Sequence, residues 1–277
     1  VTVSLTEAGV QAGDSCLVAV MADNSDDKSF PPGKTQYTLD FAYHGGIYRD
    51  VWMIAKSPVA ITDAVEAGKV AGGGVFVHFD NISDRSAEVF VNTDVKNSGK
   101  QAKSIIVETT LTDAKGLLIK KVSERLSVAP GETKTANQRI VVKNPQLWSP
   151  DTPYLYRVES RVKEGHKVCD GGITRIGIRK FEFKGKDGFW LNGTPFGQLV
   201  GANRHQDFAY VGNAVPNSQQ WRDAKRLRDA GCRIIRVAHY PQDPSFMDAC
   251  DELGLFVIVA TPGWQFWNKN PEHHMDV

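Results

Sequence analysis

The chain has 277 residues, of which 41% are hydrophobic and 23% charged, values typical of a globular protein. Its 33 basic and 32 acidic side chains leave a net charge of +1, which argues against binding to nucleic acid or to an anionic membrane. No apolar run reaches the length of a membrane-spanning helix, and the first residues do not form an intact secretory signal. The sequence therefore does not indicate a cellular compartment.

The four cysteines show no metal-ligand spacing and no pair separated by two residues. We expect small buried side chains at these positions, and no metal or other cofactor. The cysteines are Cys16, Cys169, Cys232 and Cys250.

Residues 1–56 hold too few apolar positions to bury a core of their own. An apolar run at Leu17–Met21 and an aromatic stretch around the Gly45-Gly46 pair favour β-strands. We interpret this segment as the last strands of a β domain whose beginning lies outside this sequence.

Residues 57–179 alternate apolar and polar side chains over short segments, and turn signals such as Asn97–Lys100 separate them. This regular spacing predicts a β-sandwich of immunoglobulin-like type. The Gly72–Gly74 run lacks the lysine and hydroxyl residue of a phosphate loop, so nucleotide binding is not indicated. The predicted strands lie within residues 74–83, 87–97, 103–113, 117–128, 133–144 and 154–163.

Residues 180–277 begin with a hairpin whose turn is Asn192-Gly193. Three apolar runs rich in Val, Ile and Leu follow, within residues 198–206, 233–242 and 255–267, and a helical pattern separates each from the next. This alternation predicts βαβ units and a parallel sheet. Polar and aromatic side chains end each run, at the edge where (β/α) barrels carry their chemistry.

Both helices carry recognisable end signals. Asn217 or Ser218 is expected to cap the first helix and Gly231 to end it, whereas Asp243 caps the second and Gly254 ends it. The expected buried stripes are Trp221, Ala224 and Leu227 in the first helix, and Phe246, Cys250 and Leu253 in the second.

Five segments follow one another in the chain, namely Gly45–Trp52, Leu147–Tyr156, Gly188–Pro195, Gly201–Asp207 and Arg236–Pro241. On these segments the chain resembles, over essentially its whole length, glycoside hydrolase family 2, which includes β-galactosidases, β-glucuronidases and β-mannosidases. The resemblance implies a multidomain β plus α/β fold. Residues 1–56 would be the end of a jelly-roll sugar-binding domain, 57–179 an immunoglobulin-like β-sandwich, and 180–277 the first three β/α units of a TIM barrel.

The resemblance implies a retaining mechanism, in which two carboxylates about 5–5.5 Å apart act as nucleophile and as acid/base. The family places both glutamates at the ends of barrel strands 4 and 7. A complete barrel needs about 250 residues, whereas this sequence ends at Val277, after the third strand. Neither Glu252 nor Glu272 matches the family pattern. We therefore expect a glycosidase fragment, favouring β-galactosidase, that contains no catalytic residue and is inactive by itself.

Part of the sugar-binding shell is nevertheless implied. Asp40 matches an aspartate that reaches the barrel mouth from the first domain, although a strand-edge aspartate in water is the alternative. His205 and His239 match two family histidines at the ends of barrel strands, where an imidazole can bind sugar hydroxyls.

Two arginines and two tryptophans complete the expected set. Arg204 and Arg236 could stabilise the catalytic carboxylates, or Arg236 could be the buried partner of an acid. Trp264 could offer its face to a pyranose ring, together with Trp267, or both could simply be exposed.

The expected partner is a carbohydrate with a terminal β-glycosidic bond. Three barrel strands alone would leave an unpaired parallel edge, so we also expect a homo-oligomer or a longer ordered chain. A non-catalytic carbohydrate-binding or adhesion module built on the sandwich is the alternative from another class, and β-glucuronidase or β-mannosidase are the alternative activities.

Overall fold

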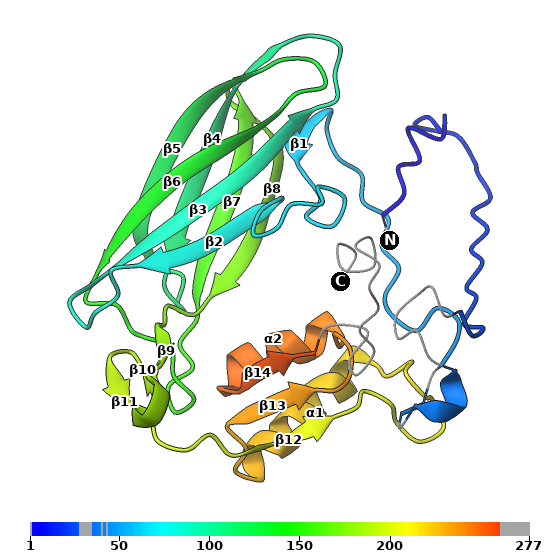
Figure 1. Cartoon of the computed structure of the whole chain (residues 1–277). Coiled ribbons are helices and arrows are strands. Elements are labelled where there is room, and N and C mark those ends of the chain that lie inside the picture. The colour runs from blue at the N-terminus through cyan, green and yellow to red at the C-terminus, as the bar shows by residue number, and fades with distance from the viewer. Residues whose placement is uncertain (1, 28–34, 40, 43, 261–277) are drawn as a thin grey trace. The chain divides into compact units, whose positions relative to one another are not determined.

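The computed structural model describes residues 2–27, 35–39, 41–42 and 44–260. The chain forms two compact units (Figure 1). The first contains residues 1–16 and 53–197, and the second residues 17–52 and 198–277.

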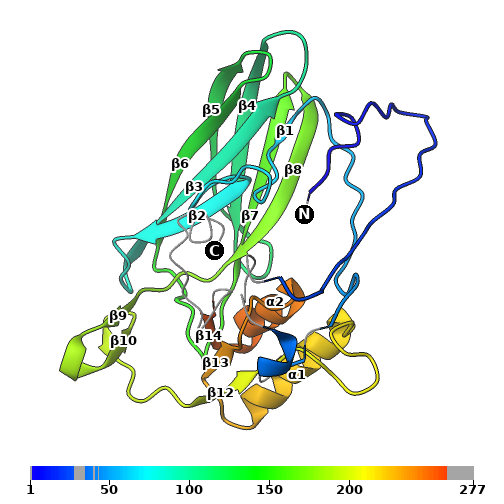
Figure 2. The ribbon, with the colours of Figure 1, turned by 45° about the vertical axis from the view of Figure 1, so that its right-hand side comes forward.

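Two antiparallel four-stranded sheets face each other in the first unit (Figures 1 and 2). In one sheet the long strand β3 pairs with β6 along one edge and with β1 and β2 along the other. The second sheet has the order β5-β4-β7-β8. The strands are β1 (Val59–Ile61), β2 (Val75–Asp80), β3 (Ser86–Asn97), β4 (Lys103–Thr112), β5 (Leu118–Val128), β6 (Thr133–Lys143), β7 (Tyr156–Glu164) and β8 (Lys167–Ile176).

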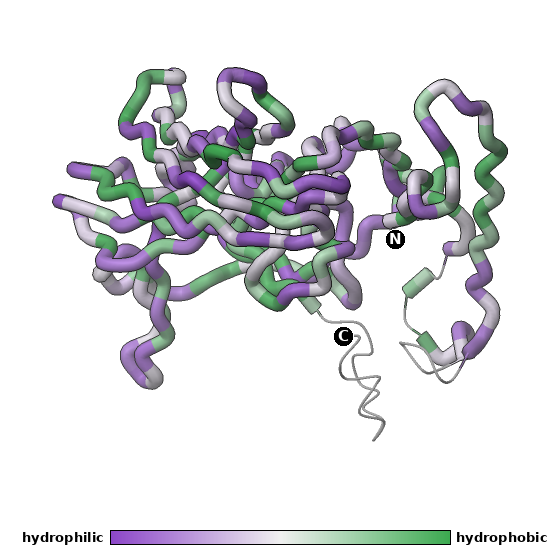
Figure 3. Tube along the Cα trace, turned by 90° about the horizontal axis from the view of Figure 1, so that it is seen from above, coloured by the Kyte–Doolittle hydropathy of each residue, from purple (hydrophilic) through white to green (hydrophobic). Residues whose placement is uncertain are grey.

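Alternation along these strands builds the core between the sheets. Val89 and Val91 of β3 share one buried cluster with Leu111 of β4 and Val158 of β7, and all four side chains are fully buried. Figure 3 shows the matching alternation of polar and apolar residues along the strands. The predicted sandwich is confirmed, and its six predicted strands correspond to β2 to β7.

Two strands of the sandwich escaped prediction. The short β1 has no room for an alternating pattern, and β8 contains Asp170, Gly171 and Gly172, which all disfavour strands. Pairing with β7 stabilises β8 in spite of these residues. The Asp170 carboxylate accepts a hydrogen bond from the backbone N–H of Ile61, at 2.8 Å, and so joins β8 to β1.

A small antiparallel sheet follows the sandwich, with β9 (Phe181–Phe183), a 3₁₀ turn (Gly185–Asp187), β10 (Phe189–Leu191) and β11 (Thr194–Pro195). The predicted Asn192-Gly193 turn is confirmed. Both residues have positive φ, 53° and 82°, as a two-residue type I′ hairpin requires.

The second unit contains the predicted β/α alternation. Parallel strands β12 (Gly201–Arg204), β13 (Ile234–Val237) and β14 (Phe256–Val259) lie side by side in chain order. Helices α1 (Asn217–Asp229) and α2 (Pro244–Leu253) connect them. The short parallel β/α segment is therefore confirmed.

The helices bury one face of this sheet. Ile235 and Val237 of β13 pack against Phe246, Ala249 and Cys250 of α2, and all five are at most 1% exposed. Cys250 is thus a buried cysteine as predicted, but the prediction is wrong for Cys16, which is exposed.

Glycine is required where β12 begins. A Cβ atom on Gly201 would lie only 1.6 Å from the carbonyl oxygen of Ile234 on β13. Any side chain at this position would therefore push the two parallel strands apart.

The end signals of α2 are confirmed. Asp243 caps its N-terminus by accepting a hydrogen bond from the Ser245 N–H at 2.9 Å, Pro244 follows, and Gly254 adopts the left-handed conformation after the last turn.

The capping prediction for α1 is wrong. Pro216 occupies the N-cap position with no side-chain cap, and the Asn217 side chain bonds instead to Asp50 and Ser245, each at 3.1 Å. Trp221 is not part of a buried stripe either, since it is 40% exposed and its indole N–H donates to Glu252 on α2.

The predicted strand at Leu17–Met21 is not formed, and the described residues before β1 contain only a 3₁₀ turn at Gln36–Thr38. Leu17 and Met21 are 96% and 90% exposed. An apolar run alone does not make a strand, because the backbone groups of a strand need a hydrogen-bonding neighbour. Among the residues that the structure describes, no helix is long and apolar enough to cross a membrane.

Candidate functional site

The candidate site lies where β12 and β13 end. Arg204 and Val237 are opposite each other in the last register pair, so the residues that follow both strands emerge at the same edge. His205 follows β12 directly, and His239 and Tyr240 follow β13 after one residue. The structure therefore brings together the two histidines that the sequence analysis selected.

Four rings cluster at this edge. The imidazoles of His205 and His239 have centroids 5.4 Å apart in an edge-to-face arrangement. The Phe41 ring lies 5.8 Å from each histidine and 5.4 Å from Tyr240. Phe41 is separated from the histidines by more than 160 residues of sequence and was missed by the sequence analysis, although it follows the selected Asp40 directly.

The position of the His239 ring proton follows from its neighbour. Arg236 Nη1 lies 3.1 Å from Nδ1 of His239. A guanidinium can only donate, so Nδ1 accepts and the ring of a neutral His239 carries its proton on Nε2. Arg236 pairs with Asn203 in the register of the sheet, and both alternate away from the helix-covered face. Arg236 therefore contacts the candidate site through the ring of His239, and the carboxylate-stabilising role expected for it stays a prediction.

His205 differs from its neighbour. Its Nδ1 is buried and has no hydrogen-bond partner within the described part of the chain. The ring as a whole is only half-buried. Nε2 is thus the nitrogen through which His205 could reach a bound molecule.

Tyr240 supplies a neutral hydroxyl at the same edge. Its oxygen accepts the backbone N–H of Gln206 at 3.5 Å, and this bond does not use the hydroxyl's own proton. Burial raises the pKa of Tyr240 above its ordinary value of 10.0, which keeps the phenol protonated at neutral pH.

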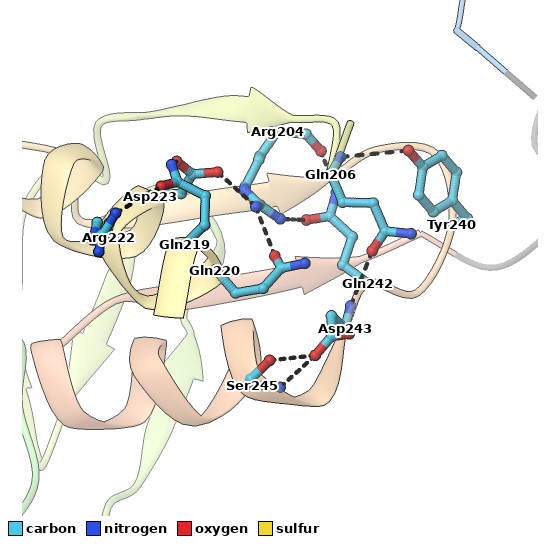
Figure 4. A network of polar contacts seen from close by, with 10 residues as sticks. All are labelled: Arg204, Gln206, Gln219, Gln220, Arg222, Asp223, Tyr240, Gln242, Asp243 and Ser245. Atoms are coloured by element: carbon cyan, nitrogen blue, oxygen red, sulfur yellow. Dashed lines mark hydrogen bonds and ion pairs between the residues drawn. The ribbon is translucent and has the colours of Figure 1, made fainter. Parts of the chain in front are cut away.

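The Arg204 side chain is directed away from the edge where His205 and His239 meet, and the carboxylate-stabilising role expected for it stays a prediction. Its guanidinium is buried toward α1 and α2, where it donates to Gln242 at 2.6 Å, to Gln220 at 2.8 Å and to Asp223 at 2.8 Å (Figure 4). It also lies 4.1 Å above the ring of Phe246. With these partners, the Arg204 side chain belongs to the interior behind the sheet.

Three predicted residues lie outside the described part of the chain, namely Asp40, Trp264 and Trp267. A separate hollow of about 500 Å³ lies beside the first turn of α1 and is lined by residues 47–50, 214–218 and Asp243. None of the predicted sugar-binding residues lines it. In the described ranges no group of three or more His, Cys, Asp or Glu residues could hold a metal ion.

Comparison with known families agrees with this architecture. Residues 73–179 match the model described as glycosyl hydrolases family 2, and residues 181–275 match that of the family 2 TIM barrel domain. The first match covers the sandwich from β2 to β8, and the second contains β9 to β14 with both helices. The chain belongs to glycosyl hydrolase family 2.

Individual relatives carry two different activities in their names. A β-galactosidase of Thermoanaerobacter pseudethanolicus is 34% identical over 90% of this chain and 31% of its own length. A β-glucuronidase of Formosa agariphila is 31% identical over 78% of this chain and 22% of its own. The crystal structure of a Bacteroides uniformis β-glucuronidase superimposes with a TM-score of 0.80 and 29% identity, covering 91% of this chain and 29% of that one. The chain thus spans about a third or less of the length of these relatives.

Proposed function

We propose that this chain forms part of the sugar-binding end of a retaining β-glycosidase that removes terminal β-linked sugars. The observation that carries the proposal is the pairing of His205 and His239 at one end of two parallel barrel strands, with rings 5.4 Å apart. Family membership supports a binding role for this edge, because the active sites of TIM barrels lie at the carboxyl ends of the strands.

The chemistry of the cluster suits a pyranose. In the tautomer that Arg236 favours, His239 presents an N–H donor on Nε2, and a sugar hydroxyl can accept from it. His205 offers its own Nε2, and Phe41 and Tyr240 offer apolar ring surface to the C–H groups of a sugar. By its family position Asp40 would add a carboxylate acceptor to this shell, and Trp264 a further aromatic face.

Bond cleavage in this proposal belongs to two glutamates of barrel strands 4 and 7, which no residue of this chain matches. Within the family, a Bacteroides uniformis β-glucuronidase has been solved covalently bound to cyclophellitol-6-carboxylate aziridine, which supports a covalent route. We therefore infer that the chain contributes binding and orientation. By the family resemblance, residues 1–56 would be the end of a jelly-roll sugar-binding domain.

The favoured activity is that of a β-galactosidase, supported by the 34% identical relative, and β-glucuronidase is the alternative because the relatives divide between the two names. Assays with nitrophenyl β-galactoside and nitrophenyl β-glucuronide, on this chain and on the complete protein that contains it, test the proposal. We expect turnover by the complete protein, reduced about 100-fold or more by His239→Gln. Robust turnover by the chain alone would contradict the absence of catalytic groups.

The alternative hypothesis, a carbohydrate-binding module built on the sandwich, predicts a different sugar-binding region in this chain. Hydrogen exchange with and without methyl β-galactoside should protect the segments around His205 and His239. Protection confined to the turns of the sandwich would overturn our assignment in favour of that module.

A further inference from the structure

Two glutamines connect the loops that carry the histidines. Gln242 is 4% exposed and Gln206 is 1% exposed, and neither is one of the four clustered rings. Burying an amide is unfavourable unless its polar atoms are hydrogen-bonded, so the partners of these two side chains identify what they hold in place.

Gln242 joins the loop after β13 to the end of β12. Its oxygen accepts from the Arg204 guanidinium at 2.6 Å, and its Nε2 donates to the Arg204 backbone carbonyl (Figure 4). The same carbonyl accepts from the backbone N–H of Ala238 at 3.0 Å. Arg204, which precedes His205, is therefore bonded both to Ala238, which precedes His239, and to Gln242, which follows His239.

Gln206 makes the reciprocal connection on the other side of His205. Its side-chain oxygen accepts from the backbone N–H of Asp243 at 3.1 Å, whereas its Nε2 has no hydrogen-bond partner among the described residues. The backbone N–H of Gln206 donates to the Tyr240 hydroxyl at 3.5 Å. Asp243 in turn caps α2. The residues directly before and after each histidine are thus hydrogen-bonded. Through Asp243 these bonds extend to α2, which packs against the sheet.

The Arg204 guanidinium holds the Gln242 amide in place and is itself held by residues of α1. Asp223 balances its charge at 2.8 Å, and Gln220 accepts a further hydrogen bond. A fixed guanidinium orients the Gln242 amide, because only the oxygen of that amide can face it. The Nε2 of Gln242 must then face the Arg204 carbonyl, which gives the amide a single orientation.

We propose that Gln206 and Gln242 are positioning residues, which set the separation and mutual angle of the His205 and His239 rings. The consequence for sugar binding rests on the function proposed above, whereas the effect on the rings does not require it. The amides act through the backbone of the two loops and do not touch the sugar.

The test replaces each amide by methionine, which is similar in size and cannot form these hydrogen bonds. Gln242→Met and Gln206→Met are compared with Gln219→Met, a matched control on α1 whose amide bonds only to the far side of Asp223 and to Arg222. The full chain is labelled with ¹⁵N-histidine, and its imidazole signals are recorded by NMR. Circular dichroism verifies that each variant is folded, and Gln206→Met, which loses a single side-chain hydrogen bond, serves if Gln242→Met does not fold.

We expect the His205 and His239 signals to shift or broaden in both loop variants and to stay in place in Gln219→Met. His78 and His166 belong to the sandwich unit and serve as internal references, because their signals should not move in any variant. Unchanged His205 and His239 signals in a folded Gln242→Met or Gln206→Met protein would overturn the proposal.

A second series titrates the same samples with methyl β-galactoside and methyl β-glucuronide. We expect binding to the parent chain, and binding weakened about tenfold or more in Gln242→Met but unchanged in Gln219→Met. Equal affinity of Gln242→Met and parent would also overturn the positioning role. If neither sugar moved the histidine signals of the parent, the proposed function would fail, while the ring signals of the first series would still decide the positioning role.

Discussion

The sandwich and the parallel sheet bury their apolar faces against different partners. In the sandwich each sheet covers the other, and residues such as Val89, Val107 and Val158 are fully buried. In the parallel sheet, among the residues that the structure describes, the core lies on the helix-covered face, and Ile258 on the opposite face of β14 is 50% exposed.

The contrast extends to polar groups. Several buried polar side chains of the sandwich, among them Thr93, Thr109 and Ser160, are small. The larger ones, Asp94, Asn97 and Gln138, bond separately to Thr135, to the Val128 carbonyl and to the Val107 carbonyl. Behind the parallel sheet the buried polar side chains are large and joined in one network around Arg204. The sandwich depends on apolar packing, whereas the candidate site depends on hydrogen bonds that hold loop ends. Substitutions of matched size should therefore act differently in the two units.

The largest effect is expected for Arg204→Ala. Removing the guanidinium leaves Asp223, Gln220 and Gln242 without their buried partner, which costs about 3–5 kcal/mol of unfolding free energy. Hydrogen exchange should show the loss in β13 and α2 but not in β7. Lys225→Ala, which removes an exposed ion pair with Asp229 on the same helix, should change the free energy by less than about 0.5 kcal/mol.

Leu111→Ala is the corresponding test of the sandwich. Leu111 is fully buried on β4, so we expect a loss of about 2–5 kcal/mol, confined to the first unit. Leu118→Ala on the neighbouring strand β5 is the control, because Leu118 is 64% exposed. Denaturant unfolding and exchange rates of β7 measure the difference. Similar losses for the two variants would contradict the described packing.

Gly201→Ala tests how closely β12 and β13 approach each other. The added methyl group would meet the Ile234 carbonyl oxygen at 1.6 Å, and we expect a cost of about 1–3 kcal/mol in the second unit. Gly172→Ala in β8 of the sandwich is the matched control, since a Cβ there meets nothing within 4 Å. If both variants unfolded at the same denaturant concentration as the parent, the strands could not be so close.

The smallest effect is a pH dependence within the sandwich. Hydrogen bonds from Lys121 and Lys163 lower the pKa of Glu108 below its ordinary value of 4.5. A lowered folded-state pKa adds stability above the unfolded-state value, and this stability is lost as pH falls through the lowered pKa. Glu108→Gln should therefore be less stable than the parent at pH 7 and lose that deficit below about pH 4. Urea unfolding between pH 7 and pH 3 measures this, and a constant difference would refute the assignment.

Local chemistry explains which elements were predictable. The cap at Asp243, the left-handed Gly254 and the Asn192-Gly193 turn depend on backbone rules that hold in any fold. The α1 cap and the position of Trp221 were mispredicted, because Asp50, Ser245 and Glu252 compete for those side chains and lie far away in sequence. The strand expected at Leu17–Met21 failed for a related reason, since strand formation requires a neighbouring strand.

The sequence by itself determined the family, the alternation of strands and helices, and the selection of His205 and His239, because these follow from short-range patterns and from residue identity. Only the tertiary structure decided that Phe41 joins the histidines, that Arg236 contacts His239, and that Arg204 is directed toward α1 and α2. These facts depend on which face of a strand a side chain occupies and on which distant segments fold against it. Both are consequences of packing, which no single stretch of sequence contains.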